Sequence, residues 1–204
     1  MRLPIKPFRR GYLDSFFSPC YNSQLESFFF RRLKKVFHVN QLVVYPAQGV
    51  GRVEAITSQE VGGSTNDYYV VRILSNDGTL LVPVKNAVNV GLRTICDSDY
   101  GLQILAFMQD WTDFRGYAGQ NWNRRYREYS EKLKTGKLED VAYVLKELIL
   151  ISQDKELSFG ERRLMEQAMA LITMELACAM GREQNEIQGE IENIFHDVLK
   201  KSEL

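Results

Sequence analysis

Residues 68–84, YYVVRILSNDGTLLVPV, decide the fold of the first half of the chain. Two runs rich in aromatic and β-branched residues flank Asn76-Asp77-Gly78. Such runs favour strands, and an Asn-Asp-Gly segment between them is typical of a tight turn, since these residues tolerate positive φ. The stretch therefore predicts an antiparallel hairpin with one strand over 68–74 and its partner over 79–84.

Two further strands are predicted before this hairpin. Gln41–Tyr45 is apolar after its first residue and stops at Pro46, and Val50–Thr57 resumes the pattern. Residues 62–66 predict a loop. An open flat sheet of four or five short strands in about 55 residues would leave its edge strands unpaired. A small, strongly bent barrel of the Tudor or SH3 type over residues 37–95 is the economical solution.

From Asp97 onward the apolar spacing becomes helical. Gly136 is expected to end a helix over 121–134, and Ser158-x-x-Glu161 is a capping box that opens a long helix ending at Gly181. The second half is therefore predicted to be an all-α helical bundle over residues 97–200. The fold class that follows is α+β with two domains.

Composition excludes several classes of function. The 204 residues carry no formal net charge, which excludes a polycation of the histone type. Three separated cysteines and two histidines indicate neither a disulfide framework, a zinc ribbon nor a histidine-based triad, so no metal and no other cofactor is expected. There is no G-x-x-x-x-G-K-[ST] motif for an ATPase motor, and no enzyme is predicted. No apolar run is long enough to cross a bilayer, so we expect no membrane contact and a cytoplasmic location.

The first 36 residues differ from the rest. Eight Lys and Arg residues face only Asp14 and Glu26, and phenylalanines are interspersed among them. Polar residues and Pro19 interrupt every apolar stretch, which argues against a signal peptide. A basic aromatic arm could bind nucleic acid or lipid, but we expect residues 1–36 to be a poorly ordered extension.

Residues 121–127, NWNRRYR, place three arginines and two aromatic rings in seven positions. On a helix Arg124 and Arg127 share one face, while Trp122 and Arg125 share a neighbouring one. Arginines can neutralise phosphates, and a flat apolar ring can wedge at an unstacked base step. The alternative is that Trp122 anchors the helix in the core and the arginines form a solvated face.

Several short motifs run in order over roughly residues 37–180. They are Val44-Tyr45-Pro46-Ala47-Gln48-Gly49-Val50-Gly51, Val82-Pro83-Val84 with Val90-Gly91-Leu92-Arg93, Asn121-Trp122-x-Arg124-Arg125-Tyr126, Val141-Ala142-x-Val144 and Leu157-Ser158-x-Gly160-Glu161-x-Arg163. Together they resemble the CarD family of bacterial transcription regulators, also called CdnL. Residues 1–36 lie outside the resemblance, since such proteins ordinarily begin near Phe37.

The resemblance implies a Tudor-like RNA polymerase interaction domain that contacts the polymerase β subunit. By carry-over the contact would use a strand edge of the barrel, a case of strand addition between chains. The residues implied are Thr57 and Ser58 together with Leu80, Leu81 and Val82, which are expected on a segment that faces them. Some family members carry arginines where Ser58 and Leu81 stand. The main-chain pairing with polymerase does not depend on these side chains, whereas the charged part of the contact does.

The resemblance also implies that the helical domain contacts promoter DNA at the upstream edge of the transcription bubble. Trp122 would act as a wedge, and the adjacent backbone would be held by Asn121, Arg124, Arg125, Arg127 and Arg163. A protein that binds polymerase and the opened fork together stabilises the open complex. Little base-sequence specificity is expected, because neither a wedge nor a phosphate clamp reads base edges. The protein would act as a monomer, associated with the nucleoid through RNA polymerase.

A second reading from another class is a Tudor or SH3-like module that binds a peptide or RNA and has no open-complex activity. Such a reader would need an aromatic cage, for which Tyr45, Tyr68 and Tyr69 are the candidates. Tyr68 and Tyr69 are adjacent and point to opposite faces of a strand, which disfavours the cage. The sequence does not identify target promoters or the sign of regulation.

Overall fold

The structure of the chain, a computed structural model, describes residues 37–61, 63–112, 114 and 121–202. These residues fall within one compact unit, Val36–Leu204. The predicted extension over residues 1–36 lies outside the described residues.

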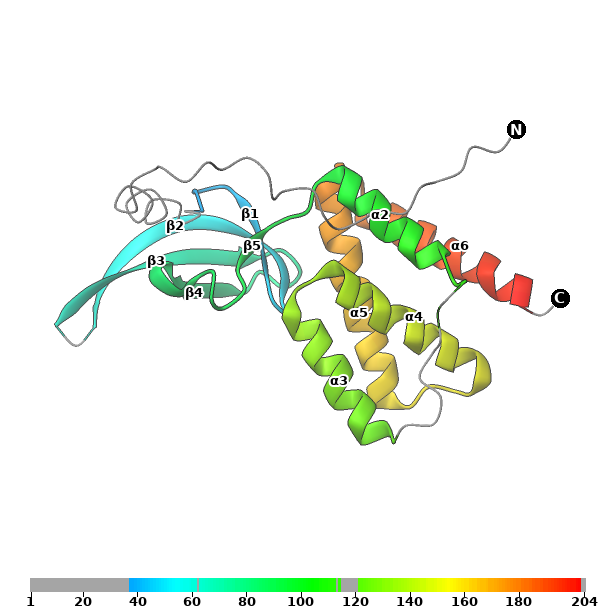
Figure 1. Ribbon diagram of the computed structural model, residues 1–204. Helices are drawn as coiled ribbons and strands as arrows, with labels where there is room; N and C mark the ends of the chain where they lie inside the picture. Colours follow the sequence, from blue (N-terminus) through cyan, green and yellow to red (C-terminus); the bar gives the residue numbers. More distant parts are fainter. Residues whose placement is uncertain (1–36, 62, 113, 115–120, 203–204) are drawn as a thin grey trace, which may run out of the picture. The chain divides into compact units, whose positions relative to one another are not determined.

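The β-rich half is a five-stranded antiparallel sheet with the strand order β4-β3-β2-β1-β5 (Figure 1). Its strands are β1 (Leu42–Tyr45), β2 (Gly49–Val61), β3 (Ser64–Ile73), β4 (Thr79–Pro83) and β5 (Arg93–Thr94), with a short 3-10 helix, η1, at Val84–Asn86. One face of the sheet covers an apolar core built from Phe37, Val43, Val53, Tyr69, Val71, Ile73, Val82, Ala87 and Leu92. This sheet is the Tudor-like part of the predicted fold.

The hairpin predicted around Asn76-Asp77-Gly78 is confirmed. Arg72 of β3 pairs with Thr79 of β4, and the Gly78 N–H donates to Oδ1 of Asn76 at 2.9 Å. Asp77 adopts φ of 55°, a left-handed conformation that aspartate tolerates better than most residues. Local turn chemistry therefore fixes the β3–β4 register.

The loop predicted over residues 62–66 is wrong at its C-terminal end. β3 already begins at Ser64, and Thr65 and Asn66 pair with Glu60 and Gln59 of β2. This part of the β2–β3 hairpin is a two-stranded ribbon, because β4 pairs only with residues 68–72 of β3. Main-chain hydrogen bonds hold such a ribbon together without an apolar face. Its sequence therefore lacks the alternation of apolar and polar residues from which a strand is predicted.

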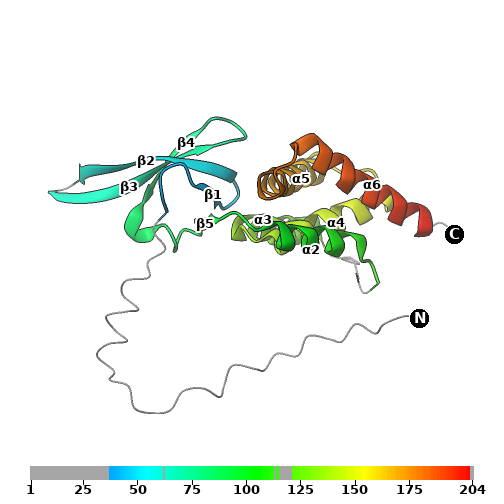
Figure 2. The same ribbon diagram turned by 90° about the horizontal axis from the view of Figure 1, so that it is seen from above.

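The second half contains five helices among the described residues: α2 (Ser98–Gln109), α3 (Trp122–Thr135), α4 (Leu138–Asp154), α5 (Phe159–Met180) and α6 (Gln184–Ser202). Helices α5 and α6 form one layer and α2, α3 and α4 form another (Figure 2). Both layers contribute to a single apolar core, which includes Ile104, Tyr129, Leu145, Ile172 and Ile191. The helical bundle predicted from the apolar spacing is confirmed.

The predicted helix ends are also confirmed. Gly136 and Gly181 adopt φ of 69° and 63° at the C-caps of α3 and α5, where an L side chain would be strained. Ser158 caps α5 by accepting from the Glu161 N–H, and the Glu161 side chain accepts from the Ser158 N–H in return. Each signal is local, which explains why it can be identified in the sequence.

A buried ion pair joins the end of the sheet to the helices. Arg93 of β5 donates from Nη2 to Oε2 of Glu175 on α5 at 2.8 Å, and from Nε to the Gly136 carbonyl at 2.8 Å. The Glu175 side chain is only 3% exposed and also accepts from the Cys96 N–H. One arginine thus connects β5, the C-cap of α3 and the C-terminal part of α5.

Lys146 of α4 is a buried cation with a structural explanation. Its Nζ donates to the Phe107 carbonyl at 2.8 Å and to the Asp110 carbonyl, and it lies over the rings of Phe107, Trp111 and Phe114. Burial lowers the pKa of this ammonium group. The contacts fasten the end of α2 and the chain that follows it to α4.

In the described part of the chain no single helix is long and apolar enough to span a membrane; α5 and residues 184–196 of α6 meet that criterion only together, across a bend of 119°.

Candidate nucleic-acid interface

The interface is built on the start of α3. Asn121 is its N-cap, and the side-chain Oδ1 of Asn121 accepts from the Asn123 N–H at 3.0 Å. The first turn contains no acidic residue, so the positive end of the helix is not neutralised by its own sequence. The cap fixes the position at which Trp122 leaves the chain.

Trp122 is half-buried and lies at the edge of the helical core. Its ring packs against the ring of Tyr126, with centroids 5.4 Å apart, and against Gly160 in the first turn of α5. A Cβ added at Gly160 would lie 2.8 Å from Cζ2 of Trp122, so only glycine leaves room for this packing. The ring is therefore neither a fully buried anchor nor a free wedge. One part is held by α5 and the rest reaches solvent.

Arg125 points toward the helical bundle. Its side chain is 11% exposed, and Nη2 donates to Oε1 of Glu161 at 3.0 Å. The two-face arrangement predicted for the arginines is thus present, but the face shared by Trp122 and Arg125 is turned inward. In this position Arg125 fastens α3 to α5.

Glu161 is the centre of this attachment and is 1% exposed. Besides Arg125, it accepts from Nζ of Lys155 at 3.1 Å, from the Ser158 N–H at 2.9 Å and from the Ser158 hydroxyl at 2.8 Å. Burial alone raises the pKa of Glu161, but the hydrogen bonds from Ser158 and Lys155 outweigh it and lower the pKa to about 2. The carboxylate is consequently charged at neutral pH.

The outward cations are Arg124 and Arg127 on α3 and Arg163 on α5, all of which are exposed. Asn121, Asn123, Arg124 and Arg127 line an open hollow together with Glu128 and Glu131. Of the arginines predicted to contact DNA, these three can reach a phosphate directly, while Arg125 is engaged with Glu161.

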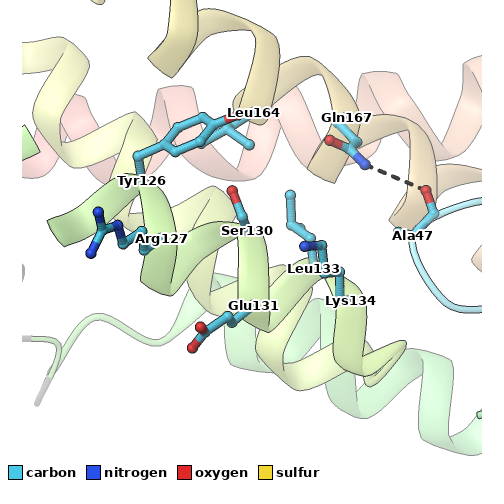
Figure 3. Close-up of a pocket in the computed structure, with 9 residues that line it drawn as sticks. All are labelled: Ala47, Tyr126, Arg127, Ser130, Glu131, Leu133, Lys134, Leu164 and Gln167. Atoms are coloured by element: carbon cyan, nitrogen blue, oxygen red, sulfur yellow. Dashed lines mark hydrogen bonds between the residues drawn. The ribbon is translucent and has the colours of Figure 1, made fainter. Parts of the chain in front are cut away.

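A groove of about 380 Å³ runs between α3 and α5 (Figure 3). Figure 3 shows Tyr126 and Arg127 on one side and Leu164 and Gln167 on the other, with Gln167 donating to the Ala47 carbonyl of the β1–β2 turn. Ser130 and Lys134 continue the α3 side of the groove toward that turn. The groove thus carries two cations, Arg127 and Lys134, and one acidic residue, Glu131, beside an apolar floor.

The residues predicted to contact polymerase lie on strands that both flank β3. Thr57 and Ser58 of β2 pair with Tyr68 and Asp67, while Leu81 of β4 pairs with Val70. The prediction that the β2 and β4 segments face each other is wrong, because β3 lies between them. Leu81 is 50% exposed, Leu80 is half-buried and Val82 belongs to the core.

Strand β4 is the end strand of the sheet in the part of the chain that the structure describes. Its outer main-chain edge is therefore available for pairing. On the outward face of the sheet, Ala55, Val70 and Leu81 share one row across β2, β3 and β4. The edge and this apolar row form a compact surface.

Two site features were not found by sequence reasoning. One is Phe159, whose side chain is 84% exposed at the start of α5. The other is the Arg125–Glu161 pair, since the capping box explains Glu161 locally and no spacing rule connects residues 36 positions apart. The first could have been suspected from a phenylalanine at the first position of a capped helix, and the second has no signal in a single sequence.

Comparison with known families accounts for both halves of the chain. Residues 37–96 match the CarD-like/TRCF RID domain, and residues 108–192 match the CarD C-terminal domain. The chain belongs to the CarD family of transcription regulators. The RID domain implies an interaction with RNA polymerase in general.

Among curated proteins the chain is similar to the "Putative transcription factor YdeB" of Bacillus subtilis (strain 168). The two are 26% identical over 153 residues, which covers 75% of this chain and 98% of the relative.

Proposed function

We propose that this protein binds the RNA polymerase β subunit through the β4 edge of its sheet and promoter DNA through the start of α3, and so stabilises the open complex during initiation. The observation that carries the proposal is the setting of Trp122. Its ring is held from one side by Gly160 and Tyr126 and lies on a helix whose exposed arginines are Arg124 and Arg127.

A preorganised ring favours the opened fork over closed duplex. Closed DNA offers no unstacked base, so the ring gains its contact only after the strands part. Stacking of one base on an aromatic side chain contributes about 1–3 kcal/mol. Binding that discriminates between the two states shifts the opening equilibrium by that difference.

Simultaneous binding of polymerase and promoter DNA explains how a small DNA-contacting surface can stabilise the open complex. Attachment to polymerase makes the DNA contact intramolecular and raises its effective concentration. The β4 edge supports this attachment because strand addition needs only main-chain groups, with Leu81 and Val70 as apolar neighbours. We expect weak binding to free DNA, little base-sequence specificity and a monomeric protein.

The test is the half-life of open complexes after heparin challenge, with no factor, the wild type or Trp122→Ala. We expect the wild type to lengthen the half-life and the variant to lose most of that gain while retaining polymerase binding and its circular dichroism spectrum. Trp122→Phe serves as a matched control that keeps an aromatic ring. A wild type that binds β but leaves the half-life unchanged would contradict the proposal and favour an interaction module with another output.

A further inference from the structure

Phe159 is the most exposed large hydrophobic side chain among the described residues, at 84%. It is the first residue of α5, where Ser158 and Glu161 already supply the cap, so helix formation does not require a phenylalanine. Burying such a ring is ordinarily favourable because it removes apolar surface from water. An exposed phenylalanine can be an isolated surface residue or part of a binding site, and its neighbours distinguish the two cases.

The neighbours of Phe159 belong to the candidate interface. Gly160, the next residue, lies under the ring of Trp122, and Glu161 binds Arg125. Helices α3 and α5 begin at the same end of the bundle, so their first turns lie side by side (Figure 1). A second aromatic ring is thus presented one residue from the contact that positions Trp122.

Helical spacing continues this arrangement along both helices. On α5, Phe159, Arg163 and Gln167 follow at intervals of four and share a face. On α3, Trp122, Tyr126 and Ser130 do the same. Tyr126, Ser130 and Gln167 line the groove of Figure 3, so each stripe leads from an aromatic ring at the helix start into that groove.

We propose that Phe159 is a second aromatic contact for opened DNA, on which an unstacked base stacks while Arg163 lies beside the adjoining phosphate. This inference rests on the proposed function. Rings interleaved with arginines suit single-stranded nucleic acid, since stacking tolerates any base and the cations follow the backbone. The exposed arginines Arg127 and Arg163 supply one cation on each helix for a phosphate backbone, and Glu131 lines the same groove.

The effect follows from what closed DNA lacks. Stacked and paired bases cannot reach Phe159, so the contact forms only with strands already separated. A second ring therefore adds to the preference for the open state that Trp122 establishes. Loss of one stacked base corresponds to a change of about fivefold or more in the open-complex equilibrium.

The experiment uses the full chain with its polymerase and compares Phe159→Ala, Phe159→Trp and the control Leu102→Ala. Leu102 is also an exposed apolar residue, at 58%, but lies on α2. We expect Phe159→Ala to shorten the factor-dependent half-life of open complexes about fivefold or to the level without factor. Phe159→Trp should preserve the half-life, and Leu102→Ala should match the wild type. Because the ring is exposed, thermal unfolding should not change.

Stacking is measured directly by the fluorescence of 2-aminopurine placed at successive unpaired positions of the upstream fork. The wild type should quench two positions, one through Trp122 and one through Phe159. Phe159→Ala should restore the fluorescence at only one of them, and Trp122→Ala should restore it at the other. Trp122→Ala in the same assay tests the proposed function separately. If that variant is defective while Phe159→Ala behaves as the wild type, the inference is wrong and the proposed function stands.

Other occupants of this surface give different results. Weaker binding of Phe159→Ala to polymerase without DNA would identify a protein partner and overturn the inference. Dissociation of a wild-type dimer into monomers by the same substitution would identify a second copy and overturn it as well. If the wild type neither lengthens the half-life nor quenches any position, the proposed function and the inference both fail.

Discussion

The Glu175 carboxylate on α5 accepts hydrogen bonds from the Arg93 guanidinium of β5 although 82 residues separate them in sequence. Arg93 also donates to the carbonyl of Gly136, the C-cap of α3. Since α3 carries Trp122, this pair connects the sheet to the helix that is proposed to contact DNA.

Replacing Arg93 by methionine should destabilise the protein. Removing one partner of a buried ion pair typically costs roughly 3–5 kcal/mol, and the partial exposure of Arg93 reduces the expected loss to about 2 kcal/mol. Urea unfolding measures the difference. The control is Arg72→Met, which breaks the exposed pair with Glu54 and should leave the midpoint unchanged. Equal effects of the two substitutions would contradict the structural role of Arg93.

Gly160→Ala should displace the Trp122 ring without harming α5, since alanine is a better helix former than glycine. The added methyl would lie 2.8 Å from the ring, which must move outward. In a Trp111→Phe background the Trp122 fluorescence should shift to longer wavelength, and the open-complex half-life should fall. Gly189→Ala on α6 meets no atom within 4 Å and is the matched control. An unchanged emission spectrum would show that the ring does not depend on Gly160.

Acid should weaken the attachment of α3 to α5. The pKa of Glu161 is lowered from 4.5 to about 2, so its charged form stabilises the folded state fully above pH 4.5. That contribution is lost as the pH falls from about 4.5 to about 2. Glu161→Gln should therefore flatten the dependence of the unfolding midpoint on pH in this window, whereas Glu156→Gln, at an exposed position, should not. A steep dependence that persists in Glu161→Gln would assign it to other carboxylates.

The arginines at the start of α3 should separate into two kinds. Arg127→Ala should weaken binding to forked DNA and reduce the salt slope of the binding constant by about 1, because one phosphate contact is lost. Arg125→Ala should lower the unfolding midpoint, because it leaves the carboxylate of Glu161 without its α3 partner. Fluorescence anisotropy across a salt series measures the first, and urea unfolding measures the second. The assignment fails if Arg125→Ala alters the salt slope but not stability.

The parts of the fold that the sequence predicted depend on neighbours close in the chain. The Asn76-Asp77-Gly78 turn, the Ser158 capping box and the left-handed Gly136 and Gly181 each satisfy a local requirement, and each is present. The polar half of the β2–β3 ribbon was missed because its strands are held by main-chain pairing, which leaves no apolar alternation in the sequence.

The candidate site was predictable in its residue types but not in its orientation. The spacing of Trp122, Arg124, Arg125 and Arg127 defined two faces, but not which face turns inward. That choice depends on Gly160 and Glu161, which meet α3 only after the chain has folded back through α4. The positions of Thr57 and Leu81 on opposite sides of β3 were likewise decided by strand order.

The seating of Trp122 against Gly160 has a kinetic consequence for the proposed function. A ring that is already fixed loses little conformational entropy when it contacts DNA. It therefore stabilises the open complex by nearly the same free energy at each promoter. A constant increment produces unequal outcomes. Where DNA recloses before initiation can proceed, the increment raises output; where the polymerase is slow to leave, the same increment lengthens the pause and lowers output. The promoter's own slowest step would then decide the sign of regulation.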